Sequence, residues 1–301
     1  MLLIDGNEIM PDLIIGCGYL GKRVARLWQA QDRDLHVLTR STARADQFQQ
    51  TGLIPVVGDV VNPDSLNELA ACEYGTILYA VGYDRSAGPS KQEVYLDGLQ
   101  NVLELVRSRC QRFLYISSTS VYGISDGSWV DEQSPTQPET ESGEICLQAE
   151  ERVRSSFSGS SASCSIIRLA GIYGPDRLLR KVEMLRENTP IPGNPEAWLN
   201  LIHVEDAARV VLAVEDVETP APLYLTADDR PPTREEYYRE LARLVGTEEP
   251  QFDDSTPAKR TSGLNKRCRN EFLKKSLSFE FQYPTYATGL PAAIAETPNL
   301  S

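Results

Sequence analysis

The residue types that build metal sites and disulfide frameworks are scarce in this chain of 301 residues. It has two histidines, His36 and His203, and its six cysteines are scattered without a C-x-x-C pair. Zinc sites need clustered Cys and His ligands, and disulfide frameworks need a regular set of cysteine pairs. We therefore expect no metal site, and we expect free thiols in a reducing compartment, which favours a cytoplasmic location.

The sequence also lacks a basic surplus and a long apolar run. The formal net charge is −13, which argues against nonspecific binding to nucleic acid or to an anionic membrane. No apolar run reaches the roughly 20 residues of a membrane span. The first ten residues carry Asp5 and Glu8 and no basic segment, unlike a secretory signal peptide. We expect a small-molecule partner, with no nucleic acid and no membrane.

A glycine cluster near the N-terminus is the strongest signal that the sequence contains. The apolar run 13–15 leads into a G-x-G-x-x-G pattern, and an amphipathic helical pattern follows it. Strand, turn and helix in that order are the context that a dinucleotide fingerprint requires. Gly16 permits the tight turn, Gly18 lets a pyrophosphate approach the backbone, and Gly21 lets the helix pack on the strand. The alternative is a glycine-rich turn without a ligand. The predicted cofactor-binding residues of this turn are Gly16, Cys17, Gly18, Tyr19, Leu20 and Gly21.

The next apolar run, 35–38, ends in Thr39, Arg40 and Ser41. A site for NAD places Asp or Glu about 20 residues after the glycines, where it holds the ribose 2′-hydroxyl. This sequence has Arg40 there, and an arginine can stack on adenine and bind a 2′-phosphate. The sequence therefore predicts NADP in preference to NAD, with Thr39 and Ser41 beside it. The alternative is that Arg40 is only a solvated residue at a strand end.

Further contacts to the cofactor are expected after three later strands. Asp59, followed by Val60, can accept a hydrogen bond from the adenine amino group, or it can cap the next turn. The small residues Ala80, Val81 and Gly82 allow a cofactor to pass closely. Hydroxyl side chains from Ser117 onward follow strand 113–116, at an edge of a parallel sheet where ligands bind.

Strands alternate with helices through most of the chain, which implies βαβ units and a parallel sheet. The predicted fold class is α/β, a Rossmann-type doubly wound parallel sheet with a smaller C-terminal α/β substrate domain. We expect residues 1–171 and 198–226 in the NADP-binding domain, and 172–197 and 227–301 in the substrate-binding domain. Within this pattern, a long helix is expected over 91–109, a loop over 125–143 and a helix over 145–157.

Four motifs, in one order along the chain, resemble the extended short-chain dehydrogenase/reductase superfamily, the NAD-dependent epimerase/dehydratase family that acts on nucleotide sugars. The resemblance covers nearly the whole chain. It implies a Rossmann sheet, a smaller substrate domain and hydride exchange with a nicotinamide. The motifs are the glycine turn 16–21, the hydroxyl-rich stretch 117–123, the stretch from Arg168 to Pro175, and Ile202-His203-Val204-Glu205-Asp206.

The resemblance assigns roles only where residues match. The hydroxyl that bonds the substrate oxygen falls on Ser118, and the segment that passes the nicotinamide contains Tyr173. Arg177 lies where the family often has a basic residue near the substrate phosphates. Arg177, Arg180, Lys181 and Arg186 form a basic set that is either a solvated face or a cradle for a substrate diphosphate.

The chain departs from the family at the proton-transfer residues. The family has a Tyr-x-x-x-Lys pair a few residues before an Ala-Glu pair, and here Ala149-Glu150 sets the register. The tyrosine position falls on Ser142 and the lysine position on Cys146, as in an atypical branch of the superfamily. Serine cannot be deprotonated usefully near pH 7 without an adjacent base, and Cys146 offers no fixed positive charge. Loss of a general acid/base typically costs 10²–10⁴-fold.

Other residues are candidates for the missing proton transfer. Tyr122 and Tyr173 each follow a strand near the expected cofactor, and either one is a catalytic phenol or a packing tyrosine with a bonded tip. His203 and Asp206 either form a His–carboxylate pair or begin and cap a helix. We take Ser118 and Tyr122 as the predicted catalytic residues.

The sequence thus predicts an NADP-binding oxidoreductase, epimerase or dehydratase with non-standard acid/base residues. Its substrate is expected to be a sugar nucleotide or another small carbonyl or hydroxyl compound. The alternative is a non-catalytic NADP-binding sensor or a module that binds a partner protein. A homodimer is the default expectation for the family.

Overall fold

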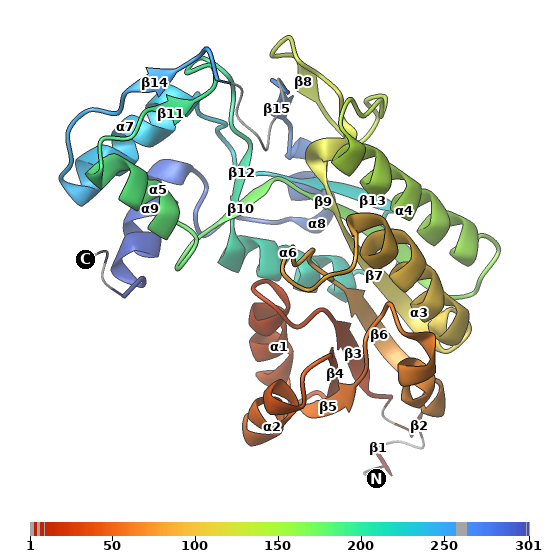
Figure 1. The fold of residues 1–301 in the computed structure, drawn as a ribbon. Helices are drawn as coiled ribbons and strands as arrows, with labels where there is room; N and C mark the ends of the chain where they lie inside the picture. The colour runs from red at the N-terminus through yellow and green to blue at the C-terminus, as the bar shows by residue number, and fades with distance from the viewer. Residues whose placement is uncertain (1–2, 5–6, 9, 257–263, 299, 301) are drawn as a thin grey trace. The chain divides into compact units, whose positions relative to one another are not determined.

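The computed structural model describes residues 3–4, 7–8, 10–256, 264–298 and 300 (Figure 1). Asp5, named above in the expectation about a signal peptide, lies outside the described residues. The chain forms two compact units. The first comprises Met1–Ser118, Glu141–Ile167 and Ala208–Tyr224, and the second comprises Thr119–Thr140, Arg168–Ala207 and Leu225–Ser301. The domain boundaries expected from the sequence stay a prediction, because backbone contacts alone define these units.

A seven-stranded parallel sheet is the centre of the part of the chain that the structure describes. Its strand order is β13-β9-β7-β6-β3-β4-β5, so successive connections run outward from β3 in both directions. This reversal is typical of a doubly wound fold, and the predicted Rossmann-type fold class is confirmed. The strands are β3 (Asp12–Ile15), β4 (Leu35–Thr39), β5 (Ile54–Val57), β6 (Tyr74–Tyr79), β7 (Cys110–Ser118), β9 (Ser163–Leu169) and β13 (Leu223–Thr226).

Helices cover both faces of this sheet. In Figure 1, α3 and α4 run beside each other on one face, and α1 and α2 lie on the other. The reversal of strand order at β3 places them so, because right-handed crossovers that move in opposite directions fall on opposite faces. The helices are α1 (Gly21–Gln29), α2 (Thr42–Gln50), the 3₁₀ helix η1 (Pro63–Ala71), the π-helical turn η2 (Glu93–Asp97), α3 (Gly98–Val106), α4 (Glu141–Phe157) and α6 (Val204–Asp216).

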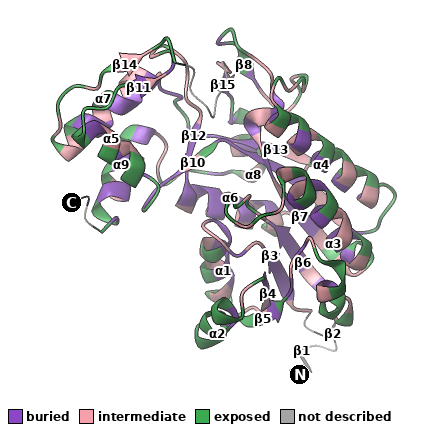
Figure 2. Cartoon of the chain, in the orientation of Figure 1, coloured by how far each residue is buried: buried purple, intermediate pink, exposed green. Residues whose placement is uncertain are grey.

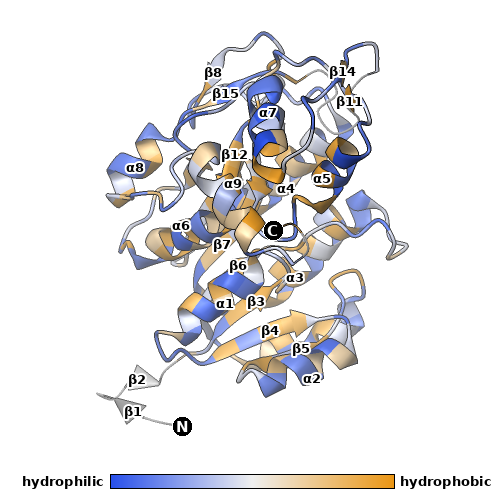
Figure 3. Ribbon diagram, turned by 90° about the vertical axis from the view of Figure 1, so that its left-hand side faces the viewer, coloured by the Kyte–Doolittle hydropathy of each residue, from blue (hydrophilic) through white to orange (hydrophobic). Residues whose placement is uncertain are grey.

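One apolar cluster of the first unit lies between the sheet and the α3–α4 face, and Val24 and Trp28 of α1 are fully buried as well. The central strands are buried, and the outer sides of the helices are exposed and hydrophilic (Figures 2 and 3). The Phe113 ring of β7 joins the sheet to α4, with its centroid 5.0 Å from that of Phe157, and within the sheet Tyr79 stacks on Tyr115 at 5.8 Å. Such pairs add about 0.5–1.5 kcal/mol each beyond their buried area.

Two of the predicted element boundaries were wrong. The helix expected over 91–109 contains the π-helical turn η2 before α3 begins at Gly98. The helix expected to begin at Ile145 begins at Glu141, so Ser142 and Gly143 belong to α4 and not to a loop. Glu141 and Glu144 in the first turn favour this start, because acidic side chains interact well with a helix N-terminus.

The second unit is built from short parallel strand pairs and from helices with their own core. Tyr237 of α7 and Leu290 of α9 are fully buried in that core. Thr233 and Glu236 form a capping box at the start of α7. The elements are β8 (Trp129–Val130), β10 (Gly171–Tyr173), α5 (Leu179–Arg186), β11 (Ile191–Pro192), β12 (Leu201–His203), α7 (Arg234–Val245), β14 (Phe252–Asp253), β15 (Arg267–Cys268), α8 (Glu271–Leu277) and α9 (Tyr286–Ala295). At the N-terminus, β1 (Leu3–Ile4) pairs with β2 (Asn7–Glu8).

Three searches of the described residues bear on the classes of site. All six cysteines lie within the described part of the chain and are free thiols. Among those same residues, no group of three or more His, Cys, Asp or Glu side chains is arranged to hold a metal ion. None of the helices within the described ranges is long and apolar enough to cross a membrane.

Candidate functional site

The glycine turn has the geometry that a dinucleotide fingerprint requires. Gly16 has φ +97°, which is a left-handed conformation that side chains disfavour, and a β-carbon there would lie 2.5 Å from the Ala80 carbonyl carbon. A β-carbon on Gly21 would lie 2.6 Å from the Gly16 carbonyl oxygen. These two glycines therefore allow the turn to pack against the end of β6 and the helix to pack against the turn.

Gly18 differs from its two neighbours because space opens beside it. The nearest heavy atom to a β-carbon on Gly18 would be the Gly16 carbonyl oxygen at 4.0 Å, and nothing lies within 4 Å of one on Gly82. Helix α1, described over its whole length, has no side-chain cap and no acidic residue in its first turn. The positive end of its dipole is thus not offset by its own side chains. The residues of this turn fit a bound diphosphate.

Two arginines follow the end of β4. Arg40, the residue predicted to select NADP, is exposed, and its Nη2 lies 3.5 Å from the Asp84 carboxylate in a solvent-screened ion pair. Arg44 Nη2 donates to the Cys17 carbonyl oxygen at 2.7 Å. A second cation therefore contacts the glycine turn itself. The sequence contained one signal for Arg44, its spacing of four residues from Arg40, and that signal was missed.

The side chains of the polar residues at the ends of β4 and β5 form hydrogen bonds to the backbone of the turns that follow. The Ser41 hydroxyl accepts from the Arg44 N–H and caps α2, and Thr39 Oγ1 accepts from the Ser41 N–H at 3.3 Å. The Asp59 carboxylate accepts from the Val61 N–H at 3.1 Å, which is the turn role considered above. Val60 is buried, and its carbonyl oxygen accepts from the Asn101 amide. The adenine contact of Asp59 stays a prediction.

The hydroxyls at the end of β7 differ in their surroundings. Ser117 is buried and donates to the Glu150 carboxylate at 2.6 Å, and that carboxylate also accepts from Arg154 Nη2 at 2.8 Å. Ser117 therefore ties β7 to α4. Ser118 is the last residue of β7 and is half-buried, which is the position expected for a hydroxyl that meets a ligand at the carboxyl edge.

Ser142 and Cys146 lie one turn apart in α4, both half-buried. The Ser142 hydroxyl accepts a hydrogen bond from Lys91 Nζ at 2.8 Å. The Cys146 thiol lies close enough to Tyr95 to contribute, after burial, to a raised pKa of that phenol. Position 146 has no lysine, but Lys91 from another helix contacts Ser142. No motif in the sequence indicated this contact.

Tyr122 of the second unit is fully buried among fixed partners. Its hydroxyl donates to the Asp131 carbonyl oxygen at 2.7 Å and accepts from Arg168 Nη1 at 2.8 Å. Burial raises the pKa of the phenol to about 12, although Arg168 acts in the opposite direction. This geometry favours the packing role considered for Tyr122, and its catalytic role stays a prediction.

Tyr173 is also buried, at the end of β10. Its ring meets the His203 ring edge-on at 5.2 Å between centroids. A β-carbon on Gly289 would overlap the Tyr173 hydroxyl, so the phenol lies over α9. Burial raises the pKa of Tyr173, and the nearby Asp228 carboxylate raises it further. The proposed contact of Tyr173 with a cofactor is likewise untested by this geometry.

His203 and Asp206 both contribute to the start of α6. His203 Nδ1 accepts from the Glu205 N–H at 3.3 Å. The Asp206 carboxylate accepts from the backbone N–H groups of Gln282 and Tyr283 at 2.8 and 2.7 Å. The buried Asp206 side chain therefore fixes a distant part of the chain, for which sequence spacing contains no signal.

The members of the basic set around α5 differ in how far their side chains are exposed. Arg177 is exposed and precedes α5, and its N–H donates to the Gly174 carbonyl oxygen. Lys181 is half-buried, with Nζ 5.7 Å from the centroid of the Tyr237 ring. Lys181 packs inward, whereas Arg177, Arg180 and Arg186 are the exposed members of the set.

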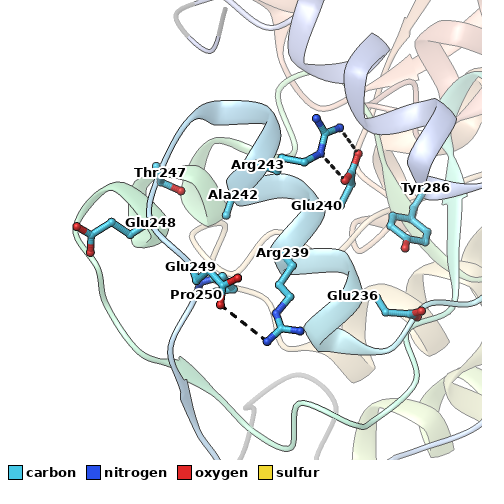
Figure 4. Close-up of a pocket in the computed structure, with 10 residues that line it drawn as sticks. All are labelled: Glu236, Arg239, Glu240, Ala242, Arg243, Thr247, Glu248, Glu249, Pro250 and Tyr286. Atoms are coloured by element: carbon cyan, nitrogen blue, oxygen red, sulfur yellow. Dashed lines mark hydrogen bonds and ion pairs between the residues drawn. The ribbon is translucent and has the colours of Figure 1, made fainter.

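A hollow of about 490 Å³ lies on the second unit, beside α7 (Figure 4). Its charged side chains pair with one another: Arg243 binds Glu240 at 2.7 Å, and Arg239 lies 3.9 Å from Glu249. These mutual pairs satisfy the charges, so the hollow presents neither a glycine-rich turn nor a cationic pocket for a dinucleotide. It contains none of the predicted site residues.

Comparisons with known proteins agree with this geometry. The model of the NAD dependent epimerase/dehydratase family matches residues 13–222. Protein YeeZ of Escherichia coli strain K12 is 30% identical over 277 residues, which cover 90% of this chain and 95% of YeeZ.

Two solved structures extend the comparison. A Methylobacillus flagellatus protein assigned to the NAD-dependent epimerases/dehydratases is 28% identical, with a TM-score of 0.74 over 96% of this chain and 98% of its own. The UDP-glucose 4-epimerase of Thermus thermophilus, solved in complex with NAD, has a TM-score of 0.81 at 15% identity. That match covers 95% of this chain and 98% of the other, and it bears on the fold alone.

Proposed function

This chain belongs to the NAD dependent epimerase/dehydratase family, and from that membership we propose that it is an NADP-dependent oxidoreductase, epimerase or dehydratase. Family membership assigns it to a class of NAD(P)-dependent enzymes. The proposed substrate is a sugar nucleotide or another small compound with a carbonyl or hydroxyl group. The resemblance of the four sequence motifs to enzymes that act on nucleotide sugars supports a sugar nucleotide as one substrate class.

The observation that carries the proposal is the open space at Gly18, with Arg44 in contact with the turn and Arg40 at the end of β4. A pyrophosphate can approach Gly18 at the N-terminus of α1, where backbone N–H groups and the helix dipole favour an anion. Arg40 stands where an NAD site has a carboxylate, and Arg44, four residues later, contacts Cys17. Their charges attract a 2′-phosphate that a carboxylate would repel.

The remaining roles follow from position in the chain. When bound, the nicotinamide exchanges a hydride with a substrate carbon. We assign Ser118, at the carboxyl edge of the sheet, to hold the substrate oxygen by its hydroxyl. We assign the exposed Arg177 to the phosphates of a nucleotide substrate, because an acidic protein needs a local cation to bind an anion.

Calorimetric titration of the protein with NADP⁺ and with NAD⁺ tests the cofactor assignment. We expect saturable binding of both, tighter for NADP⁺. Turnover is then measured by NADPH oxidation with methylglyoxal, diacetyl and benzaldehyde. Because an epimerase or a dehydratase returns the hydride and leaves the cofactor unchanged overall, turnover of UDP-glucose is measured by chromatography of the sugar nucleotide after incubation with the protein and NADP⁺. Binding without turnover of any probe would contradict the enzymatic part of the proposal.

A second candidate function is a non-catalytic NADP-binding sensor or partner-binding module. The observation that favours it is the absence of a phenol at Ser142 and of a lysine at Cys146, where the resemblance expects an acid/base pair. Tight NADP⁺ binding together with no turnover is the result that this candidate predicts. The same titration and probes therefore separate the two functions.

A further inference from the structure

Lys91 and Ser142 form a contact between two helices of the first unit. Lys91 Nζ donates to Ser142 Oγ at 2.8 Å, although the two residues lie 51 positions apart in the chain. Both side chains are half-buried. Lys91 begins the helical segment that continues through η2 and α3, and Ser142 is the second residue of α4.

Both residues lie at the carboxyl edge of the sheet. The helical segment of Lys91 lies between β6 and β7, and α4 lies between β7 and β9, so each helix leads from the carboxyl end of one parallel strand back to the start of the next. Ala80, Val81 and Gly82 directly follow β6, and Ala80 packs on the glycine turn. Ligands of open α/β sheets bind at this edge, so the Lys91–Ser142 contact stands on the side of the sheet where chemistry is expected.

Several further contacts fix the two helices in register. Lys91 and Tyr95 face Ser142 and Cys146, and the members of each pair are four positions apart in the chain. Further along both helices, Arg152 Nη1 of α4 donates to the Leu96 carbonyl oxygen at 2.7 Å. The π-helical turn η2 lies in this stretch, and such turns are frequent at functional sites.

The loop before Lys91 holds the ammonium group from its other side. Lys91 Nζ lies 5.6 Å from the centroid of the Tyr83 ring. The Tyr83 N–H in turn donates to the Tyr95 hydroxyl at 3.1 Å. Among the described residues, the cation is therefore positioned by an aromatic face and by a hydroxyl, and not by a carboxylate that would neutralise it.

We propose that Lys91 is a positioning residue that supplies a fixed positive charge to the Ser142 hydroxyl, and that Ser142 transfers the proton to and from the substrate oxygen. This inference rests on the proposed function. In this arrangement the charge comes from the helix after β6 instead of from position 146 of α4. The hydroxyl of Ser142 accepts from Lys91 and keeps its own hydrogen for a second partner.

The proton balance of a carbonyl reduction is closed by these two residues. The hydride that the reduced nicotinamide supplies forms the new C–H bond, while the C=O π pair moves to oxygen. Ser142 Oγ gives its proton to that oxygen to form the O–H bond, and Lys91 Nζ returns a proton to Ser142. Solvent reprotonates Lys91, and the oxidation of an alcohol runs through the same steps in reverse.

A thiol at position 142 tests the charge without cofactor or substrate. Ser142→Cys is made in a Cys146→Ala background, and its alkylation by iodoacetamide is followed at pH 7 by mass spectrometry. A cation within about 4–6 Å lowers a thiol pKa by 1–3 units, so Lys91→Met should slow alkylation about tenfold or more. Lys91→Arg should preserve the rate, and Arg107→Met, a charge removed from the exposed end of α3, should not change it.

Turnover with the carbonyl probes named above supplies the second readout. Lys91→Met and Ser142→Ala should each lower kcat about 10²-fold, with KM and NADPH affinity little changed. Lys91→Arg should recover most of the lost rate, and Arg107→Met should match the wild type. Thermal melting of each variant shows whether it has folded.

The two readouts separate the failure of this inference from the failure of the proposed function. Alkylation at position 142 that is independent of Lys91 overturns the inference, whether or not turnover is found. Wild-type turnover with an unchanged kcat in Lys91→Met overturns it as well. Wild-type protein that binds NADPH and reduces no probe contradicts the proposed function instead, and the alkylation rates still decide the Lys91–Ser142 pair.

Discussion

A β-carbon on Gly16 would lie 2.5 Å from the carbonyl oxygen of Ala80. The first turn of the fold is thus in contact with the end of the neighbouring strand β6. Any side chain at Gly16 must displace that backbone or leave its φ of +97°. Gly18, two residues on, has open space instead.

This contrast gives the first prediction. Gly16→Ala should lower the free energy of unfolding by roughly 1–3 kcal/mol through backbone strain, and should abolish dinucleotide binding. Gly18→Ala should leave stability nearly unchanged while it weakens NADP⁺ binding about tenfold, or 1.4 kcal/mol. Urea unfolding and calorimetric titration of both variants measure these effects. Full NADP⁺ affinity in Gly18→Ala would contradict the assigned path of the pyrophosphate.

Arg40 provides a prediction about cofactor choice. Arg40→Ala should weaken NADP⁺ binding by roughly 1.5–3 kcal/mol, the value of a hydrogen bond to a charged group, and leave NAD⁺ binding nearly unchanged. Asp84→Asn should strengthen NADP⁺ binding slightly, because Asp84 then no longer pairs with the guanidinium. Titrations with both dinucleotides at fixed ionic strength provide the measurement. An equal loss for both would show that Arg40 does not read the 2′-phosphate.

Arg177 provides a prediction about substrate. Arg177→Gln should weaken the binding of UDP-glucose several-fold while NADP⁺ binding stays intact. Lys275→Gln, a charge removed from the exposed last turn of α8, serves as the control outside the basic set and should change neither. Competition titrations measure both ligands. Equal losses of the two ligands in Arg177→Gln would argue against a diphosphate cradle.

Substitution of Tyr122 distinguishes a structural role of this residue from a catalytic one. Tyr122→Phe removes the partner of the Asp131 carbonyl and of the Arg168 guanidinium. Leaving these buried groups without that partner should destabilise the protein by about 1–3 kcal/mol. The rate with any active probe should stay close to that of the wild type, measured below the melting temperature. A stable variant with a rate 10²-fold lower would restore Tyr122 as the catalytic phenol.

Glu132 provides a prediction about pH. Burial raises the pKa of its carboxyl above the ordinary 4.5, although the Leu225 N–H donates to it at 2.8 Å. The folded protein therefore holds a proton that the unfolded chain has lost between pH 4.5 and the raised value. Stability contributed by this group is present below that window and falls as the pH rises through it.

Glu132→Gln keeps an acceptor for the Leu225 N–H but cannot titrate. It should remove this part of the pH slope of the unfolding free energy, measured by urea unfolding from pH 4 to 8. A slope in the variant equal to that of the wild type would show that another group titrates in this range.

The sequence was most informative where local pattern and fold coincide. The spacing of Gly16, Gly18 and Gly21 after an apolar run predicted a turn whose geometry agrees with each assigned role. The alternation of apolar strands and helices predicted the doubly wound sheet. Both signals depend on residues close together in the chain, so they can be found without knowledge of the tertiary structure.

Only some of the candidate proton-transfer residues could be predicted from local sequence patterns. Alignment of Ala149-Glu150 with the family's Ala-Glu pair identified Ser142 and Cys146. The start of α4 was predicted four residues too late, because residues 141–144 show no strong hydrophobic periodicity. Lys91 belongs to no motif, and Arg44 was passed over beside Arg40. Each is significant only through a contact made across the fold.

The sequence by itself determined the fold class, the glycine turn between β3 and α1 and the departure from the Tyr-x-x-x-Lys pair, since neighbouring residues encode all three. Only the tertiary structure decided that Lys91 meets Ser142, that Arg44 meets Cys17 and that Asp206 binds the backbone of Gln282. The physical reason is that a hydrogen bond depends on a separation of about 3 Å in space. Residues tens of positions apart reach that separation only when the chain has folded.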